Sequence, residues 1–352
     1  MKSDNKTTST KEEKRKDAHI EIALHKEIDL MKDPFPQTVL KFQTFPEIDF
    51  KDIDTLCRLF NHDFNLPLMI LGMTGGVDRG YDINTRLAQV ATQFNIPMGL
   101  GSLKLLIKER HNPSAYAKKS FDMKKSFPSL FLVGNIGLAS FNEGIHLDDI
   151  KWLIDTLELN AFCFHINAMQ ECIQPEGQKN FKGLIKHLEK ACQEIKIPLI
   201  LKEVGFGIDP DSFKLIKNIG LSAIDLASKG GTNWSLIEGM RGSLRLGTVF
   251  KDWGNSLEES LQNCQLNCQS DSSLSLIASG GIRNGLHCAQ ALSLGATAVG
   301  IGLPLMKAAV QDIENQTQTL EQEILFFEES LKISLFCTGS DSLEALKARH
   351  EK

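Results

Sequence analysis

Eight short apolar runs, separated by longer amphipathic stretches, constrain the fold of this chain more than any other feature. Several gaps between the runs have the pattern of helices, for example 148–158, 183–195, 211–219 and 285–294. Strands that are apolar on both faces and alternate with helices form parallel sheets covered by those helices. The pattern therefore predicts an α/β fold, a closed (β/α)8 TIM barrel over residues 66–316. Its strands are expected at 66–71, 96–100, 130–136, 161–166, 197–201, 222–226, 274–278 and 296–301.

An open, doubly wound sheet is the alternative fold. It predicts a Gly-x-Gly-x-x-Gly turn after the first strand, whereas that strand here leads into Gly72-Met73-Thr74-Gly75-Gly76. We therefore favour the barrel. Residues 1–65 then form an N-terminal arm and pre-barrel segment, and residues 317–352 form C-terminal helices on the outside of the barrel.

Charge and cysteine usage argue against several classes of protein. Lys and Arg number 39 against 44 Asp and Glu, so the basic excess of a nucleic-acid-binding protein is missing. No segment approaches the roughly 20 apolar residues that span a bilayer, and the polar start has no signal-peptide core. The 8 cysteines form no Cys-x-x-Cys pair, and Cys264 and Cys268 are the closest two. We expect a cytoplasmic protein without a structural zinc site, a nucleic-acid partner or a membrane span.

Glycines and small polar residues follow seven of the expected strands. Any one of them is most simply a turn, but together they describe a wide, polar mouth at the end where TIM barrels carry their active sites. Gly280-Gly281 opens onto a helix after the seventh strand, Gly230-Gly231-Thr232 follows the sixth, and Gly300-Ile301-Gly302 ends the eighth. Backbone N–H groups at such turns and at helix N-termini bind anions, so we expect a phosphate site here.

Lys202 is the most unusual single residue, because period-2 alternation places it with Ile200 on one face of the fifth strand. A lysine inside a barrel needs an anionic partner. Three partners stay open: a substrate carbonyl in Schiff-base chemistry, the N1/O2 edge of a reduced flavin, or a structural ion pair with Asp225 or Glu203.

Polar residues also follow the fourth strand. His165 and Asn167 share a face by the same alternation, and Gln170 and Glu171 lie just beyond. A carboxylate at that place can hold Mg2+ against a diphosphate, although a lone Glu in a loop is more often solvated. Arg15-Lys16 and His19, in the N-terminal arm, read by themselves as part of a solvated basic run.

Taken in order, these motifs resemble the type 2 isopentenyl-diphosphate isomerases, a flavin-dependent family. The resemblance covers roughly residues 13–340. It rests on Arg15-Lys16-Asp17-Ala18-His19-Ile20, Met73-Thr74-Gly75-Gly76, His165-x-Asn167-x-x-Gln170-Glu171, Gln174-Pro175-Glu176-Gly177, Lys202-Glu203-Val204-Gly205-Phe206-Gly207, Gly230-Gly231-Thr232-Asn233-Trp234 and Ala278-Ser279-Gly280-Gly281-Ile282-Arg283.

The resemblance implies a TIM barrel that interconverts isopentenyl and dimethylallyl diphosphate with FMN, Mg2+ and NADPH, the last only to reduce the flavin. It implies that Lys202, Gln170 and His165 are catalytic and that Glu171 binds Mg2+. It places the substrate on Arg15, Lys16, His19, Ser102, Lys104, His165, Asn167 and Gln170. It places FMN on Gly72, Met73, Thr74, Gly75, Ser102, Asn135, Lys202, Ala227, Thr232, Gly280, Gly281, Ile282, Gly302 and Leu303.

The isomerisation moves a proton and a double bond without net redox change. We therefore expect acid–base work by reduced FMN, whose anionic N1/O2 edge Lys202 holds, while the arm closes over the diphosphate as a lid. We also expect a homo-oligomer, a tetramer or octamer, because the C-terminal helices carry apolar Phe326, Phe327, Leu331 and Leu335.

The chain departs from the family pattern at four places. This chain has Ser102-Leu103-Lys104 where the family usually has Ser-Gln-Arg, and Ala18 where it usually has a polar residue. It has Leu303 where a glycine is common, and Ala227-Ser228 where a small residue and a glycine are typical. The first change is expected to weaken substrate contacts, because Lys offers a point charge in place of the Arg fork. The chemistry-bearing residues stay, so activity is expected.

Three alternatives stay open. The first is an FMN-dependent oxidoreductase of the hydroxy-acid oxidase type, although the constellation of that chemistry, a strand-end His base with paired Arg residues for a carboxylate, is not recognisable. The second is a non-catalytic barrel that binds FMN or a diphosphate. The third is a Schiff-base lyase that uses Lys202.

Overall fold

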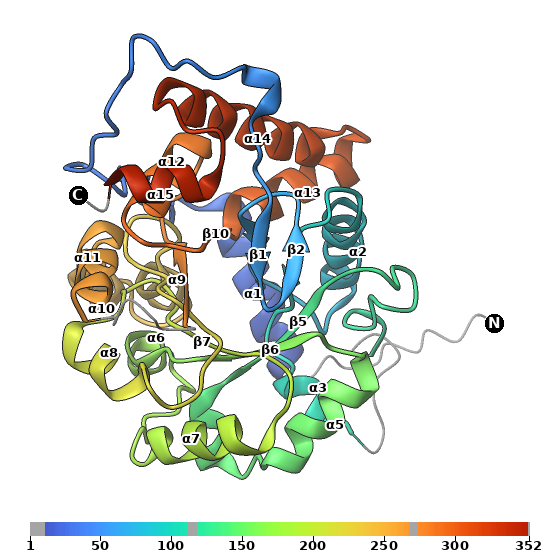
Figure 1. Ribbon diagram of the computed structural model, residues 1–352. Coiled ribbons are helices and arrows are strands. Elements are labelled where there is room, and N and C mark those ends of the chain that lie inside the picture. The colour runs from blue at the N-terminus through green and yellow to red at the C-terminus, as the bar shows by residue number, and fades with distance from the viewer. Residues whose placement is uncertain (1–10, 111–117, 268–273, 351–352) are drawn as a thin grey trace.

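The computed structural model describes residues 11–110, 118–267 and 274–350 of the chain, and Cys268 lies outside them. Eight parallel strands close a barrel in the order β10-β3-β4-β5-β6-β7-β8-β9 (Figure 1). Each predicted run contributes one strand, so the predicted fold is confirmed. The strands are β3 (Leu68–Ile70), β4 (Met98–Gly99), β5 (Leu132–Gly137), β6 (Ala161–His165), β7 (Leu199–Lys202), β8 (Ala223–Asp225), β9 (Ser275–Ser279) and β10 (Ala298–Ile301).

Helices surround the barrel and cover the apolar outer faces of its strands (Figure 1). The four helices expected from the sequence are present as α5 (Leu147–Leu157), α7 (Leu184–Glu194), α8 (Pro210–Ile216) and α12 (Gly285–Ser293). The others are α2 (Asp78–Gln93), α3 (Lys104–Lys108), α6 (Ala168–Ile173), α9 (Trp234–Arg241), α10 (Leu244–Val249), α11 (Leu257–Asn267) and α13 (Leu303–Asn315), with the 3-10 helices η1 (Phe50–Asp52) and η2 (Leu138–Glu143).

A short hairpin closes the amino end of the barrel. It consists of β1 (Cys57–Leu59) and β2 (His62–Phe64), which pair antiparallel. Phe64 meets Phe131 edge to face, with ring centroids 5.1 Å apart, and Phe131 immediately precedes β5. The pre-barrel segment therefore covers the end of the barrel opposite to the carboxyl ends of the strands. The sequence analysis did not identify this hairpin.

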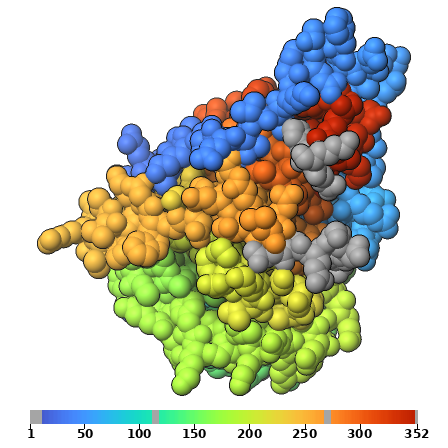
Figure 2. All heavy atoms as spheres, turned by 60° about the vertical axis from the view of Figure 1, so that its left-hand side comes forward, coloured from blue at the N-terminus to red at the C-terminus, as the bar shows by residue number. Residues whose placement is uncertain are grey.

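The N-terminal arm begins with α1 (Lys11–His25), of which Ile20 and Ala23 are buried. The segment after α1 is tied to the loop that follows β8. Leu30 N donates to Gly231 O at 3.1 Å, and Asn233 N donates to Ile28 O at 2.9 Å. Figure 2 shows the N-terminal segment, in blue, lying along the orange part of the surface. The arm is thereby held at the carboxyl end of the barrel.

Two further helices, α14 (Thr319–Cys337) and α15 (Leu343–His350), pack on the outside against α12 and α13, as expected. The apolar residues on which we based self-association are mostly not available for it. Phe327, Leu331 and Leu335 are buried inside the chain, whereas Phe326 is exposed. They contribute to the intramolecular core, so that basis for an oligomer was wrong.

Four of the seven described cysteines are buried as small apolar residues are. Cys57, Cys163, Cys264 and Cys288 are buried, and none of the described cysteines forms a disulfide. Burial raises the pKa of the Cys163 thiol to about 12. In the part of the chain that the structure describes, no helix is long and apolar enough to cross a lipid bilayer.

Candidate functional site

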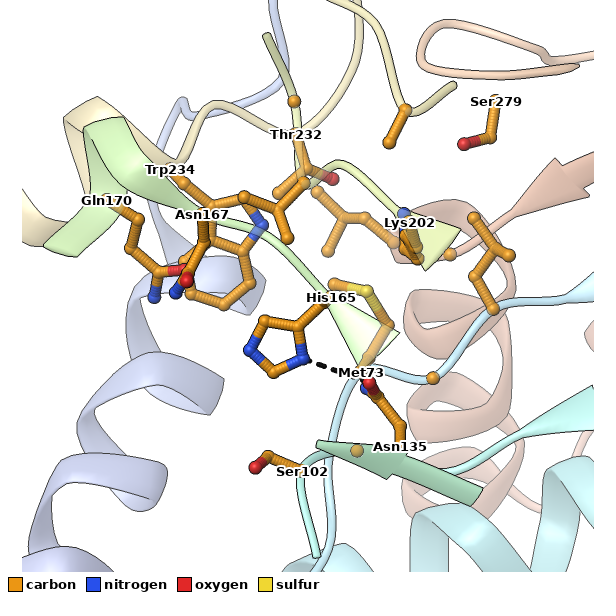
Figure 3. Close-up of a pocket in the computed structure, with 18 of the residues that line it drawn as sticks. Met73, Ser102, Asn135, His165, Asn167, Gln170, Lys202, Thr232, Trp234 and Ser279 are labelled. Atoms are coloured by element: carbon orange, nitrogen blue, oxygen red, sulfur yellow. Dashed lines mark hydrogen bonds between the residues drawn. The ribbon is translucent and has the colours of Figure 1, made fainter. Parts of the chain in front are cut away.

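A cavity of about 1440 Å³, including its part open to solvent, lies at the carboxyl ends of the strands and is partly covered by α1 (Figure 3). All residues predicted to bind substrate, FMN or metal, or to be catalytic, line this one cavity. They are Arg15, Lys16, His19, Gly72, Met73, Thr74, Gly75, Ser102, Lys104, Asn135, His165, Asn167, Gln170, Glu171, Lys202, Ala227, Thr232, Gly280, Gly281, Ile282, Gly302 and Leu303.

A turn with two glycines, between β9 and α12, forms part of the cavity wall. Gly280 and Gly281 have φ values of 103° and 97°, a conformation that side chains disfavour. A Cβ on Gly280 would lie 2.0 Å from the Ser228 carbonyl oxygen, so only glycine fits there. Asn284 caps the N-terminus of α12 by accepting from His287 N. Backbone N–H groups at such a glycine turn can hold a phosphate group. The first turn of α12 is engaged elsewhere, since Gly285 N donates to Ser330 Oγ of α14 at 2.7 Å.

Lys202 ends β7 and faces the cavity. Its Nζ donates to the Glu203 carbonyl oxygen at 2.9 Å and lies 3.2 Å from Asp225 Oδ2. Of the two ion pairs considered from the sequence, the one with Asp225 is present. The Glu203 carboxylate instead accepts the backbone N–H groups of Val204, Gly205 and Phe206. Burial raises the pKa of Glu203 to about 7, against the opposing effect of these donors.

His165 ends β6 beside Lys202 in the parallel register. Its Nδ1 lies 2.9 Å from Asn135 Oδ1. Burial lowers the pKa of His165 to about 3, and the charges of Lys202, Arg15 and Lys104 act in the same direction. The imidazole is therefore neutral at pH 7, with Nδ1–H donating to Asn135.

A second set of polar contacts lies along α6. Asn167 Nδ2 donates to Gln170 Oε1 and to Glu171 Oε1, both at 3.0 Å. Gln170 Nε2 donates in turn to Glu238 Oε1 at 2.8 Å. These contacts fix the amide of Gln170 and hold the Glu171 carboxylate in the lining of the cavity.

Sequence reasoning missed Glu238, which lies on α9 with a side chain that is 0% exposed. Its carboxylate is 2.9 Å from His19 Nε2 and accepts Arg241 Nη1 at 2.5 Å. Burial opposes ionisation, but the contacts with His19, Gln170 and Arg241 outweigh it and lower the pKa of Glu238. A signal was present in the sequence: Glu238 follows apolar Ile237 on the helix after the Gly230-Gly231 turn.

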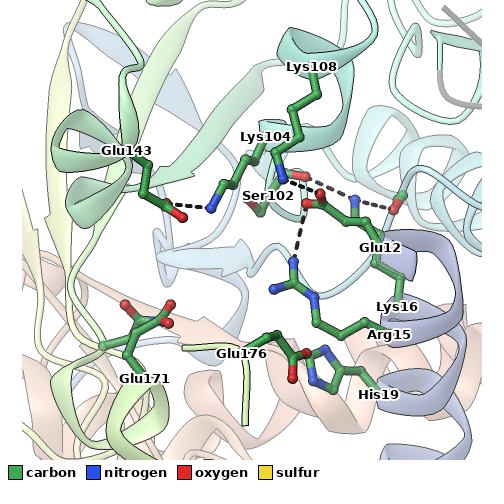
Figure 4. A network of polar contacts seen from close by, with 12 residues as sticks. Glu12, Arg15, Lys16, His19, Ser102, Lys104, Lys108, Glu143, Glu171 and Glu176 are labelled. Carbon is green, nitrogen blue, oxygen red and sulfur yellow. Dashed lines mark hydrogen bonds and ion pairs between the residues drawn. The ribbon is translucent and has the colours of Figure 1, made fainter. Parts of the chain in front are cut away.

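The basic residues of the arm contact the loops after β3 and β4 (Figure 4). Lys16 Nζ donates to the carbonyl oxygens of Gly75 at 2.6 Å and Ser102 at 3.1 Å. Burial lowers the pKa of Lys16 to about 7. Glu12 joins Arg15, at 3.3 Å, to Lys108 of α3, at 2.7 Å. The arm is therefore bound to the mouth of the barrel by ionic contacts.

Several buried polar atoms at the cavity have no hydrogen-bond partner among the described residues. They include two donors, Arg15 Nε and the Thr74 hydroxyl. Buried polar groups are normally paired, so both are suited to a ligand's acceptor atoms. Lys104 differs, since its ammonium pairs with Glu143 on the cavity wall.

Two described carboxylates line the cavity, and Glu171 is the candidate for Mg2+ because Glu143 is paired with Lys104. The described residues contain no group of three or more His, Cys, Asp or Glu side chains that could hold a metal ion. Mg2+ is commonly bound through one or two carboxylates together with substrate phosphates and water. The site therefore fits a metal that arrives with a diphosphate and does not fit a fully protein-bound ion.

Comparisons with known proteins place the chain in a family. Residues 165–352 match the sequence profile of FMN-dependent dehydrogenases. The chain is 35% identical over 339 residues to an isopentenyl-diphosphate delta-isomerase of Rickettsia bellii (strain OSU 85-389), covering 95% of each chain. It is 35% identical over 348 residues to the enzyme of that name from Nostoc sp., covering 96% of this chain and 95% of that one.

Solved structures with the same fold are more distant. A mandelate oxidase with an FMN adduct superposes with a TM-score of 0.62 at 15% identity, covering 90% of this chain and 88% of that one. A flavocytochrome b2 with sulfite superposes with a TM-score of 0.65 at 16% identity, covering 91% and 77%. At these identities the likeness shows the fold alone. The relatives and the matched profile together show that the chain belongs to the FMN-dependent, type 2 family of isopentenyl-diphosphate delta-isomerases.

Proposed function

We propose that this isomerase interconverts isopentenyl diphosphate and dimethylallyl diphosphate with reduced FMN as the acid/base, Mg2+ on the diphosphate and NADPH as the flavin reductant. The observation that carries the proposal is one cavity with two chemically different halves. Lys202 and the Gly280-Gly281 turn lie in one half, and Arg15, Gln170 and Glu171 lie in the other. The first half suits a flavin with its phosphate, and the second suits a diphosphate.

The residues present fit FMN. The backbone N–H groups at Gly280 and Gly281 would hold its phosphate, and Lys202 would face its anionic edge. When bound, reduced FMN supplies an electron-rich π face and an N5–H proton donor. The chain's own task is to hold that ring system still and to keep water away from the alkene.

The second half of the cavity would hold the substrate. Arg15 offers an unpaired Nε, and the Gln170 amide is fixed by Asn167 and Glu238. Glu171, held by the Gln178 N–H at 2.6 Å, would bind Mg2+ together with the diphosphate oxygens. His165 is neutral without ligand, so an anion beside it would favour its protonation.

Residues 1–65 comprise the N-terminal arm and the pre-barrel segment, and the arm is proposed to act as the lid of the site. The barrel, residues 66–316, is proposed to carry the chemistry, and residues 317–352 to support it. A cytoplasmic location and a homo-oligomer also remain proposals. Exposed apolar side chains at Leu244, Val249 and Trp253 offer a surface for self-association in place of the C-terminal helices.

A hydroxy-acid oxidase activity is the second candidate, because the matched profile is that of FMN-dependent dehydrogenases. Such chemistry requires a His base and Arg residues for the substrate carboxylate. The cavity-lining arginines are Arg15 and Arg283. Arg283 is held by both carboxylate oxygens of Asp29, at 2.5 and 2.6 Å, and Arg15 comes from the arm. This arrangement favours the isomerase.

The test is a visible spectrum of the purified protein, followed by anaerobic conversion of isopentenyl diphosphate with NADPH and Mg2+, each omitted in turn. We expect bound flavin and product far in excess of the NADPH consumed. Lys202→Met should lower turnover about 10²–10³-fold, whereas Lys229→Met, outside the cavity lining, should not. NADPH or O₂ consumption equal to product would favour the oxidase. Flavin binding without any conversion would favour a non-catalytic barrel.

A further inference from the structure

A buried acid lies directly behind Lys202. Asp225 is the last residue of β8 and is 2% exposed. It is the register partner of Lys202 on the neighbouring strand, and its Oδ2 lies 3.2 Å from Lys202 Nζ. Oδ2 receives no hydrogen-bond donor of good geometry among the described residues. The Lys202 ammonium is thus the cation that this oxygen faces.

The other carboxylate oxygen is fixed from two sides. Ser279, the last residue of β9, donates its hydroxyl to Asp225 Oδ1 at 2.5 Å, and Ala227 N donates to the same oxygen at 3.3 Å. Three elements therefore set the position of this carboxylate: β8, β9 and the loop after β8. Such a carboxylate has little freedom to move away from Lys202 when a ligand binds above it.

The remaining titratable groups around Lys202 do not replace Asp225. His165, its partner on β6, is neutral, and the Glu203 carboxylate is turned toward three backbone N–H groups. Cys163 is a buried thiol deeper in the barrel. The charge that Lys202 presents to the cavity is therefore balanced mainly by Asp225.

We propose that Asp225 is a positioning residue that orients the Lys202 ammonium and partly neutralises it, and thereby weakens the preference of the site for reduced over oxidised FMN. The inference rests on the proposed binding of FMN next to Lys202. Reduced flavin carries negative charge at the edge that Lys202 would face, whereas oxidised flavin is neutral there. Because Asp225 balances part of the Lys202 charge, the ammonium withdraws less electron density from the reduced ring. A ring richer in electrons suits an acid/base that must give and regain a proton.

Two substitutions should act in opposite directions. Asp225→Asn keeps the shape but removes the negative charge, so Lys202 attracts reduced FMN more strongly. Ser279→Ala removes a hydrogen bond that draws charge out of the carboxylate, so Asp225 neutralises Lys202 more completely. A purely structural role for Asp225 would instead loosen the site for both redox forms alike.

The experiment measures the dissociation constants of oxidised and reduced FMN, and the reduction potential of the bound flavin, for each holoenzyme. For Asp225→Asn we expect the preference for reduced FMN to rise about tenfold, a positive shift of about 30 mV for the two-electron couple. For Ser279→Ala we expect about a threefold change in the opposite direction, about 14 mV. Asp312→Asn, which removes a buried acid paired with Arg86 away from the cavity, should leave the potential unchanged.

Equal loss of affinity for both redox forms, or shifts of the same sign in both variants, would overturn the proposal. If Asp225→Asn does not fold, the sign of the Ser279→Ala shift decides alone, because that variant keeps both charges. A wild-type protein that binds no FMN would contradict the proposed function and not this inference in particular.

Discussion

His165 makes the stability of the free protein depend on pH in a way that can be calculated. Its pKa is lowered to about 3 in the folded chain, primarily by burial, whereas an unfolded histidine titrates near pH ~6.5. As the pH falls below ~6.5 the unfolded chain binds a proton that the folded chain refuses. Folding stability is therefore fully present above this value and is lost as the pH falls from ~6.5 toward ~3.

The size of the effect follows from the shift. Each pKa unit corresponds to about 1.36 kcal/mol, so acidification from pH ~8 to ~5 removes about 2 kcal/mol through this residue. The cavity is open to water, which screens the imidazole, and we therefore expect about 1 kcal/mol. His165→Gln removes the titration and keeps an amide that can donate to Asn135. Its loss of stability between the two pH values should be smaller by that amount.

The assay is urea unfolding of the FMN-free protein and of His165→Gln at both pH values. The difference between the two proteins cancels the contributions of the other titrating groups. Curves that shift in parallel, within about 0.5 kcal/mol, would show that His165 is protonated freely in the fold. The same shift predicts that inorganic diphosphate binds with proton uptake in the wild type and with less uptake in the variant, measurable by calorimetry in two buffers.

Three further predictions concern the backbone and the C-terminal helices. Gly280→Ala should abolish FMN binding, because its Cβ would lie 2.0 Å from the Ser228 carbonyl oxygen; Gly144→Ala, with positive φ but open space, is the matched control. Ala227 has a φ of 37°, so Ala227→Gly should relieve strain and raise stability by about 0.5–1 kcal/mol in thermal unfolding. Asp312→Asn removes the buried acceptor that ties α13 to α2 and α14 and should cost about 3 kcal/mol in urea unfolding; unchanged stability would contradict that role.

The barrel was predictable because its signal is local. Each strand is indicated by an apolar run of a few residues, and side-chain alternation then places Lys202 and His165 on the inner face of the barrel. The carboxyl ends of parallel strands meet at one mouth, so motifs far apart in the chain could be assigned to one site. This is why the predicted site residues all line a single cavity.

The contacts that tune the site were not predictable in the same way. Glu238 acts on Gln170, 68 positions away, and Ser279 acts on Asp225, 54 positions away. No local period encodes such a pair, since each depends on how two elements pack. The same holds for the C-terminal helices, because the sequence does not show whether their apolar side chains form an interface or belong to the chain's own core. Leu331 is 0% exposed, so it belongs to the core.

The structure changes how the replacement of the family's Ser-Gln-Arg by Ser102-Leu103-Lys104 is interpreted. Leu103 is 0% exposed and does not line the cavity, and its N–H donates to the Asn135 carbonyl oxygen at 2.8 Å. Leu103, which replaces the family glutamine, therefore packs in the core. The replacement leaves the substrate without a polar side chain from this position. Lys104 does line the cavity but is paired with Glu143.

The ion pair between Lys104 and Glu143 gives a more specific prediction for substrate binding than the loss of an Arg side chain does. A diphosphate that recruits Lys104 must compete with the Glu143 carboxylate on the cavity wall. Glu143→Gln should then lower the KM for isopentenyl diphosphate several-fold, with kcat and FMN affinity unchanged, because an exposed ion pair contributes about 0.2–1 kcal/mol. Steady-state kinetics at low and high salt would detect it, since added salt should erase the difference between variant and wild type. A KM that rises in the variant would mean that Glu143 orients Lys104 for the substrate and does not compete with it.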